Sequence, residues 1–517
     1  MYALLGGILC LVVFHQAYTG YQRRRLHAHI PAVGSDNVLS SYFTAMKYWM
    51  RANDIIHEGY RKHKGSIFKI PQFTGWLFIA SGDELVEELR NADENVLSSA
   101  AALVDLLQTD YTIGRSVREN LYHIHVLRTT LNKNLASILP DAIDEIAAAF
   151  KDELDAKLGD GEWTPLAVTD LFTRIICRVS NRSFVGLPLC RIPDYCTTVE
   201  SFAQNVVLGG TFLNCFPDFL RPAVASVVNT TGGNLRKMMH YTGPVVDERK
   251  RLIEEHGEDY PGKPVDMLSW IIDNAPHNEH YSTENLVRRV LTVNFVALHS
   301  TSLSFVHALY SLAARQQYIM PLREELEQHL GKEPATWTKD SFNPCWKLDS
   351  FLKESQRLNG LGAFSLLRKT MRPYTFRDGT WLPEGVIVTA SQTASHTDSE
   401  HFTNADTFDG FRFFRARERA AQTEAVEYTQ EHLEDQGSED WQYRLTSTSP
   451  HYLAFGGGRH VCPGRFYAAL ELKCMLSFLL LNYDVRMKDA GVRPPDVWIG
   501  PTSLPSSSAK VEFRRRT

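Results

Sequence analysis

Apolar residues recur every three or four positions along most of the chain, which is the spacing that places them on one face of a helix. This spacing predicts helices over 83–91, 138–159, 163–184, 264–275, 283–315, 345–358 and 464–482. Shorter runs rich in β-branched and aromatic residues predict strands at 66–70, 76–80, 374–376 and 386–390. No internal repeat that would indicate a solenoid is present. The predicted fold class is therefore mainly α (α+β), a helix-rich body with small β-sheets.

The N-terminal residues differ from the rest because they form one continuous apolar run. Residues 2–18 carry no charge, and Arg23, Arg24 and Arg25 follow them. Arginines after such a run favour a membrane anchor with the remaining chain on the cytoplasmic side, whereas a cleaved signal peptide carries its charge before the run. We therefore expect an uncleaved transmembrane anchor at 1–22, a basic linker at 23–41 and one catalytic domain at 42–517.

Composition excludes several classes of protein. With 517 residues, of which 44% are hydrophobic and 22% charged, the chain can bury a large core and has no bias towards disorder. The formal net charge of -5 gives no support to nucleic-acid binding, which normally shows a basic excess. Eight scattered cysteines without a C-x-x-C pair indicate neither a disulfide framework nor a cysteine-based zinc site. The segment 416–449, rich in Glu, Gln and Ser, is expected to be a solvated surface insertion.

One cysteine stands out by its setting. The stretch from Phe455 to Gly464 reads FGGGRHVCPG, so Cys462 follows a glycine loop and comes just before the predicted helix 464–482. Glycines let the main chain pass flat against a large planar ligand, and free N–H groups at the start of a helix favour a thiolate. A thiolate bound axially to haem iron pushes electron density onto the metal. A buried inert cysteine and a nucleophile are the alternatives, but the glycine density argues against the first and no oxyanion partner supports the second.

A charged group is expected behind this loop. Glu354 and Arg357 are three residues apart in the predicted helix 345–358, which places both side chains on one face. Alone, such a pair is usually a surface ion pair of little weight. Arg412, in the aromatic-rich turn FDGFRF between that helix and Cys462, is the expected third member. If the three side chains meet, they form a buried charged network that clamps the core behind the loop.

The order of these motifs, E-x-x-R, then the Phe-Arg turn, then F-x-x-G-x-[RH]-x-C-x-G, resembles that of the cytochrome P450 family of haem-thiolate monooxygenases over essentially the whole chain. The resemblance implies the cytochrome P450 fold and haem b, with Cys462 as the axial iron ligand and Phe455 shielding the sulfur. It also gives Glu354, Arg357 and Arg412 a structural role.

The resemblance further implies which residues bind the haem propionates. His460 and Arg368 match the family's usual partners. The helix near residue 122 lacks the tryptophan common in the family and offers Arg128 instead, with Tyr122 and Lys133 as weaker candidates; a solvated basic helix face is the alternative. The complete expected cofactor-binding set is Cys462, Phe455, Gly458, Arg459, His460, Arg368 and Arg128.

The predicted helix 283–315, which Ser282 is expected to cap, carries the expected catalytic residues Ala297, His299, Ser300 and Thr301. The family commonly has A-G-x-[DE]-T-[TS] here, so the resemblance implies that Ala297 leaves room for dioxygen and that Ser300 positions a proton-donating water. His299 takes the place of the acid. It either relays protons, because its ordinary pKa is near 6.5, or is a polar core residue bonded to a helix carbonyl. The A-L-H-[ST]-T-S form resembles fungal members that oxidise terpenoids.

The implied reaction inserts one oxygen atom from O2 into a hydrophobic small molecule by hydroxylation, epoxidation or multi-step oxidation. The expected substrate is a terpenoid of fungal secondary metabolism. Because the chain has no G-x-G-x-x-G loop, electrons are expected from NADPH through a separate NADPH-cytochrome P450 reductase, with cytochrome b5 as a further partner. The expected location is the endoplasmic reticulum membrane, single-pass, with the catalytic domain in the cytosol. The rival functions are a haem-thiolate isomerase or dehydratase acting on a hydroperoxide, and a non-enzymatic haem protein.

Two surfaces follow from the same resemblance. Arg459, Arg465 and Lys473 are expected to form part of the reductase docking face. Substrate contacts are expected in five mainly apolar segments, which favours a bulky hydrophobic substrate. These segments are 103–117, 212–216, 294–297, 361–366 and 502–505.

Overall fold

The computed structural model describes residues 7, 14–15, 17–19, 21–22, 27, 29–34, 38–72, 75–228, 230–427, 440–489 and 491–516. Most of the predicted anchor 1–22 and the arginines at 23–25 lie outside the described residues, as does the middle of the predicted surface insertion. The predicted division into anchor, linker and catalytic domain therefore stays a prediction.

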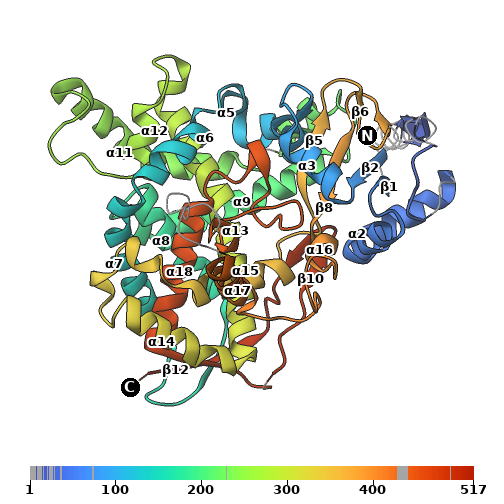
Figure 1. Ribbon diagram of the computed structural model, residues 1–517. Coiled ribbons are helices and arrows are strands. Elements are labelled where there is room, and N and C mark those ends of the chain that lie inside the picture. The colour runs from blue at the N-terminus through green and yellow to red at the C-terminus, as the bar shows by residue number, and fades with distance from the viewer. Residues whose placement is uncertain are drawn as a thin grey trace.

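A twisted five-stranded sheet forms one side of the molecule (Figure 1). Its strand order is β1-β2-β8-β5-β3, and only the β2–β8 pair is parallel. The inner strand β2 is buried at every residue, in keeping with its uninterrupted apolar sequence. The helices α2 and α3 pack on this sheet. The bounds are β1 Ile67–Gln72, β2 Gly75–Ala80, β3 Leu97–Ser98, β5 Phe364–Thr370, β8 Ile387–Ser391, α2 Val38–Lys62 and α3 Asp83–Asn91.

Helices make up the larger part of the molecule (Figure 1). The α-helices are α4 Ser99–Leu107, α5 Arg115–Glu119, α6 Tyr122–Val126, α7 Leu135–Glu153, α8 Val168–Phe184, α9 Pro193–Leu213, α10 Arg221–Val228, α11 Gly232–His256, α12 Met267–Asp273, α13 Thr283–Ala314, α14 Ile319–His329, α15 Trp346–Leu358, α16 Gln392–His396, α17 Arg412–Glu427 and α18 Arg465–Asn482. The short π-helical turns are η1 Asp110–Gly114 and η2 Leu127–Leu131. The short 3-10 turns are η3 Asp155–Lys157, η4 Leu189–Arg191, η5 Glu279–Tyr281, η6 Gln316–Tyr318, η7 Pro334–Thr336, η8 Asp340–Phe342, η9 Asp440–Tyr443 and η10 Gly458–His460.

Three smaller sheets complete the fold. One has the order β4-β12-β9, and the other two are hairpin-like pairs, β10–β11 and β6–β7. The bounds are β4 Thr164–Ala167, β6 Tyr374–Thr375, β7 Trp381–Leu382, β9 Tyr483–Met487, β10 Val497–Ile499, β11 Thr502–Leu504 and β12 Lys510–Arg515. The predicted class, helix-rich with small sheets, is confirmed.

Helix α13 runs through the middle of the helical part and organises the core (Figure 1). It packs against α8, α9, α11, α15 and α18. Its start agrees with the predicted cap, because the Ser282 hydroxyl accepts a hydrogen bond from the Asn285 amide at 3.4 Å. Its central and last turns carry fully buried residues such as Leu298, Phe305 and Leu309. Among the described residues, α13 has the length and composition to cross a membrane, but 61% of its most apolar window is buried inside the protein.

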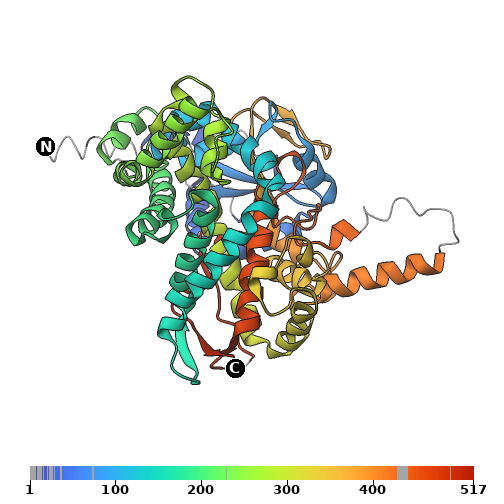
Figure 2. The same ribbon diagram turned by 90° about the vertical axis from the view of Figure 1, so that its left-hand side faces the viewer.

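Several predicted boundaries were displaced. The helix expected from residue 163 begins only at Val168, because 164–167 form the strand β4, which pairs with β12. The helix expected to reach residue 159 ends at Glu153 and continues as the 3-10 turn η3. The predicted insertion 416–449 begins inside α17, a helix that projects from the body (orange, Figure 2).

Candidate functional site

The loop that carries Cys462 is closed by its own backbone. The Cys462 amide donates to the Phe455 carbonyl at 2.9 Å, and helix α18 begins three residues later at Arg465. The φ angles of Gly456 and Gly458 are 71° and 61°, which only glycine adopts easily. Burial raises the pKa of the Cys462 thiol, and hydrogen bonds with the backbone of Gly464 and Arg465 only partly oppose this. The backbone N–H groups at the helix start therefore favour the thiolate, as expected, but they do not outweigh burial. A bound cation such as iron would deprotonate the coordinating thiol.

The glycines of this loop serve packing more than the sequence suggested. A Cβ on Gly458 would lie 2.0 Å from the carbonyl oxygen of Arg90, and one on Gly457 would lie 2.4 Å from the Arg90 side chain. Gly458 therefore needs glycine because its loop presses against the backbone at the end of α3, whereas at Gly457 only the flexible Arg90 side chain would have to move. At Gly456 a Cβ would meet its nearest atom only at 3.7 Å, so there the left-handed backbone is the reason for glycine. Gly458 thus has a role that does not depend on a planar ligand.

Cationic side chains gather beside the loop. Arg368, in β5, is 2% exposed, and its Nε and Nη2 atoms have no hydrogen-bond partner among the described residues. Burial lowers the pKa of Arg368 to about 10. Burial and the neighbouring charges of Arg368 and Arg128 lower the pKa of His460. Glu94 faces this group with an oxygen 3.1 Å from Nε2 of His460. A buried guanidinium with two free nitrogens is costly unless an anion binds it.

Glu94 was not anticipated from the sequence. Its carboxylate accepts hydrogen bonds from the Ser98 hydroxyl at 2.5 Å and from the Ala100 amide at 2.9 Å. Burial alone would raise the pKa of Glu94, but these hydrogen bonds outweigh it and lower the pKa. In the sequence, Glu94 is recognisable only as an acidic residue shortly before α4, where it can cap the start of that helix. This position gives no indication that Glu94 lies near Arg368 and His460.

Three of the expected cations have partners that the sequence did not indicate. The Arg459 side chain is 63% exposed and lies 3.5 Å from Asp93, and its expected contact with a propionate stays a prediction. Lys473 is largely buried and pairs with Asp349 at 2.6 Å, which removes it from a docking face. Arg465 donates to the Cys462 carbonyl at 3.2 Å and stacks on Phe466, so it supports the loop. Sequence spacing alone does not tell which way such long side chains turn.

Glu354, Arg357 and Arg412 come together behind the loop. Arg357 donates from Nε and Nη2 to the two Glu354 oxygens, both at 2.8 Å, and both side chains are fully buried. Arg412 approaches the same carboxylate at 3.1 Å. Arg357 also donates to the carbonyls of His396 and Ala405, the latter at 2.7 Å. The carboxylate and both guanidinium groups are thus well paired, which is what makes burial of these charges tolerable.

The middle of α13 presents the expected polar residues differently. Ser300 is exposed and its hydroxyl donates to the Val296 carbonyl at 3.0 Å, whereas Thr301 is 3% exposed and belongs to the core. Ala297 is partly buried. The His299 ring is hydrogen-bonded to the backbone of Glu200 in α9, and burial lowers its pKa. Its Nε2 is buried without a partner in the described part of the chain. His299 therefore has the backbone bond of a polar core residue and still one free nitrogen.

The residues fit the haem that the motifs imply. Cys462 offers a soft sulfur donor on a fixed loop, and Arg368 offers two unpaired nitrogens to a carboxylate group. Arg128 is exposed on η2, and the adjoining Asn132 donates to the Pro463 carbonyl at 3.4 Å, which holds this helix against the cysteine loop. Neighbouring Tyr122 stacks with Arg289 and leaves its hydroxyl unpaired within the described structure. Cys462 would thus hold the iron, and Arg368, His460 and Arg128 the propionates.

Comparison with known proteins agrees with this geometry. The family model of cytochrome P450 matches residues 39–513. Cytochrome P450 monooxygenase 151 of Postia placenta is 38% identical over 100% of this chain and 98% of its own length. Cytochrome P450 monooxygenase CYP512U6 of Ganoderma lucidum is 32% identical over 94% and 92% of the two chains. Cytochrome P450 monooxygenase paxQ of Penicillium paxilli is 29% identical over 98% and 96%. The predicted enzyme class and cofactor are thereby confirmed. The chain belongs to the cytochrome P450 family, whose members are monooxygenases with a thiolate-ligated haem and electrons supplied by a reductase.

Proposed function

We propose that this enzyme oxidises a bulky, hydrophobic terpenoid of fungal secondary metabolism by hydroxylation, epoxidation or multi-step oxidation. The observation that carries the proposal is the set of accessible apolar side chains on the segments expected to contact substrate. Leu103, Leu106, Phe212 and Val296 are 45–50% exposed although they lie on the main helices of the fold. An apolar lining of this kind favours a ligand with few polar groups.

These segments are held in two pairs. Asn214 joins the segments 103–117 and 212–216, because its side-chain amide donates to the Asp105 and Leu106 carbonyls at 3.1 and 3.0 Å. The segments 361–366 and 502–505 are joined where the Ser503 amide donates to the Leu361 carbonyl at 3.1 Å. The far end of 103–117 is less apolar. Asp110 and Arg115 there line a cavity of about 580 Å³ together with Arg288, which supports a role in entry rather than in holding an apolar skeleton.

The proton path proposed here uses residues of α13. When bound, the haem supplies the activation of dioxygen. Ser300, accessible on α13, holds a water next to that reaction, and Ala297 keeps the adjoining position small. His299 supplies protons to this water from its free Nε2, while its bond to the Glu200 backbone fixes the ring. Because burial lowers the pKa of His299, the ring is neutral at pH 7 and takes up each proton only transiently.

The membrane is the proposed source of the substrate. Four exposed apolar side chains, Phe43, Met46, Trp49 and Met50, lie on α2, and Phe219, beside α10, is 71% exposed. The rings of His15 and Phe219 lie 6.0 Å apart, which places His15 beside the exposed Phe219. Such a surface supports attachment to the cytosolic face of the endoplasmic reticulum through a single-pass anchor. There NADPH-cytochrome P450 reductase and cytochrome b5 would be its partners, with exposed Arg459 on the docking face.

The test is product analysis after co-expression with a reductase, across a panel of terpenoids. We expect a product that carries one or more added oxygen atoms and that forms only with NADPH and O2. Ser300→Ala should keep the haem spectrum and NADPH use but lose product relative to NADPH consumed. Ser302→Ala is the matched control, because Ser302 is a buried serine of the same helix, bonded to the His299 carbonyl at 3.2 Å.

Two outcomes would contradict the proposal. Turnover of a lipid hydroperoxide without NADPH would identify an isomerase or dehydratase. Absence of NADPH-dependent O2 uptake in the reductase-supported, haem-loaded protein would identify a haem protein without this activity. Oxidation of hydrophobic compounds other than terpenoids would overturn the substrate class alone.

A further inference from the structure

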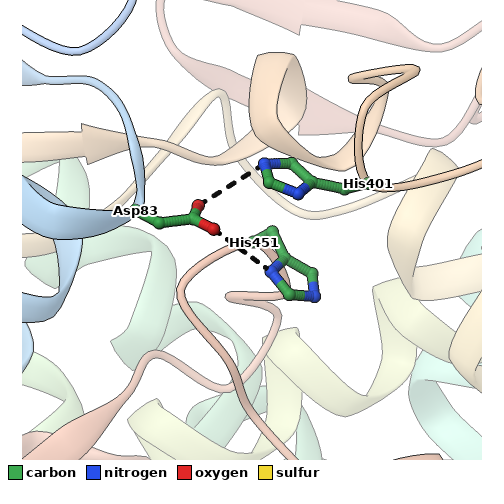
Figure 3. A group of neighbouring side chains, drawn as sticks. All are labelled: Asp83, His401 and His451. Atoms are coloured by element: carbon green, nitrogen blue, oxygen red, sulfur yellow. Dashed lines mark ion pairs between the residues drawn. The ribbon is translucent and has the colours of Figure 1, made fainter.

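Two histidines and an aspartate meet at a place unrelated to the haem ligands. Asp83 is the first residue of α3, His401 lies in the turn after α16, and His451 lies in the loop that leads to Cys462. Each ring faces one oxygen of the Asp83 carboxylate (Figure 3). The Oδ1–Nε2 distance to His401 is 3.4 Å and the Oδ2–Nδ1 distance to His451 is 3.8 Å. The donor atoms of the three residues all lie within 4.8 Å of one another.

These distances are longer than hydrogen bonds and close to those between ligands of one metal ion. N–H···O hydrogen bonds measure about 2.7–3.2 Å. Two ligands at about 2.0–2.1 Å from a tetrahedral zinc ion are instead separated by about 3.4 Å. The Oδ1–His401 distance has this value, whereas the Oδ2–His451 distance is longer and the two imidazole nitrogens are within 4.8 Å of each other. The rings of His401 and His451 are nearly parallel, with an interplanar angle of 12° and centroids 4.6 Å apart, so binding of one ion requires at least one ring to rotate until its lone pair points at that ion.

The surroundings leave the donor atoms available. Nδ1 of His451 is buried and makes no hydrogen bond to any described residue. His401 and His451 line a cavity of about 510 Å³, which gives water room to occupy a fourth ligand position. The basic residues that line the same cavity are Lys353, Arg412, Arg415 and Arg419. The Lys353 ammonium group donates to the Gln442 and Arg444 carbonyls at 2.7 and 3.0 Å. Arg412 pairs with Glu354 and Arg415 pairs with Asp409, so these cations already have partners of their own.

We propose that Asp83, His401 and His451 form a binding site for a divalent transition-metal ion of the zinc type, separate from the haem iron. Two imidazoles and a carboxylate suit Zn²⁺, whereas Mg²⁺ and Ca²⁺ prefer oxygen ligands. The ion joins three segments that are far apart in sequence. One of them is the loop before Cys462, so the bound ion restrains the position of that loop relative to α3.

The test uses the full-length, haem-loaded protein without a histidine tag. Equilibrium dialysis against Zn²⁺ should give one zinc ion per chain above the level of a His401→Ala/His451→Ala double variant. Zinc-edge X-ray absorption, which is independent of the iron, should show nitrogen and oxygen ligands at about 2.0 Å. Mg²⁺ in the same experiment should not bind. Zn²⁺ should also raise the melting temperature of the unmodified protein but not of the double variant.

The single variants sharpen the result. Asp83→Asn and His451→Ala should each weaken zinc binding roughly tenfold or more, since even changes outside the ligand set commonly cost this much. His256→Ala is the matched control, because Nε2 of exposed His256 lies 3.8 Å from Glu255 and no third ligand joins them among the described residues. Equal zinc binding by the unmodified protein and the double variant would overturn the proposal, as would equal losses for His256→Ala and His451→Ala. The carbon monoxide difference spectrum of each variant verifies that it is folded around haem.

Discussion

The buried pair of Arg357 and Glu354 gives the sharpest prediction about the stability of the fold. Replacing Arg357 with Ala removes both 2.8 Å bonds to Glu354 and the 2.7 Å bond to the Ala405 carbonyl. The carboxylate stays fully buried and, among the described residues, keeps Arg412 and the Asp409 amide as partners. Breaking a buried pair costs about 3–5 kcal/mol when the remaining charge is left alone. Because Arg412 still compensates the Glu354 carboxylate, we expect the lower end, about 3 kcal/mol, which is a loss of roughly 100-fold in the folding equilibrium.

That loss is a large part of a normal domain stability of about 5–15 kcal/mol. We therefore expect Arg357→Ala to give little folded, haem-loaded protein, measured from the carbon monoxide difference spectrum per mole of chain. Where folded Arg357→Ala is too scarce to measure, Arg357→Lys serves instead. Lysine keeps the charge but cannot make the two parallel bonds, so we expect a lower urea midpoint than in the unmodified protein.

A matched control lies on the surface. Arg251 bonds Glu248 and Glu255, each at 2.7 Å, in the same bidentate manner but with a side chain that is 51% exposed. Arg251→Ala should leave the urea midpoint unchanged, because solvent replaces the lost bonds. If Arg357→Lys and Arg251→Ala shift the midpoint equally, burial of the pair adds nothing and the reasoning fails.

Three further outcomes are expected. Cys462→Ala should abolish the red-shifted Soret band of the reduced, carbon monoxide-bound protein; an unchanged band would remove Cys462 as the iron ligand. Arg368→Leu should weaken haem retention roughly 10- to 100-fold, as for the loss of a charge-assisted hydrogen bond, measured by haem transfer to apomyoglobin. Arg459→Ala should not weaken haem retention. Equal haem-transfer rates for the Arg368→Leu and Arg459→Ala variants would show that Arg368 does not hold a propionate. Burial lowers the pKa of His396 to about 3. Below about pH 6.5, His396 therefore binds a proton in the unfolded chain but stays neutral in the folded chain. Stability should therefore fall by up to about 1.4 kcal/mol per pH unit as the pH drops from 6 to 4, and a urea series in which His396→Asn shows the same slope would contradict this.

Local sequence signals predicted the elements and their chemistry but not the directions of the side chains. The helix at 83–91 and the cap at Ser282 could be found because helix periodicity and capping act over a few residues. The start of α8 could not, since β4 forms only through its pairing with β12, more than three hundred residues later in the chain. The sequence predicted that Glu354, Arg357 and Arg412 form a charged network. Their burial could not be predicted, because it depends on how α15 packs against the turn before Arg412.

In the candidate site, too, local sequence predicted some residues, whereas others became recognisable only in the folded chain. Cys462 follows from its loop, but the outward turn of Arg459 and the burial of Lys473 depend on Asp93 and Asp349, which only the fold brings near. The role of Arg90 gives no readable signal, because it comes from the contact of α3 with the cysteine loop. Glu94 is recognisable only as an acid before α4, and its approach to His460 depends on the fold. Asp83, His401 and His451 are three ordinary polar residues in the sequence and become a group only in the folded chain.

Helix α3 makes a mechanical connection across this side of the molecule. Its nine residues span about 13 Å, with Asp83 at one end and Arg90 near the other. Because no atom larger than hydrogen fits between Gly458 and the Arg90 carbonyl, the loop of Cys462 cannot slide along the helix without moving it. A displacement of the first turn of α3, where Asp83 lies, should therefore also move the loop that carries Cys462, because this backbone contact leaves no space between the helix end and Gly458.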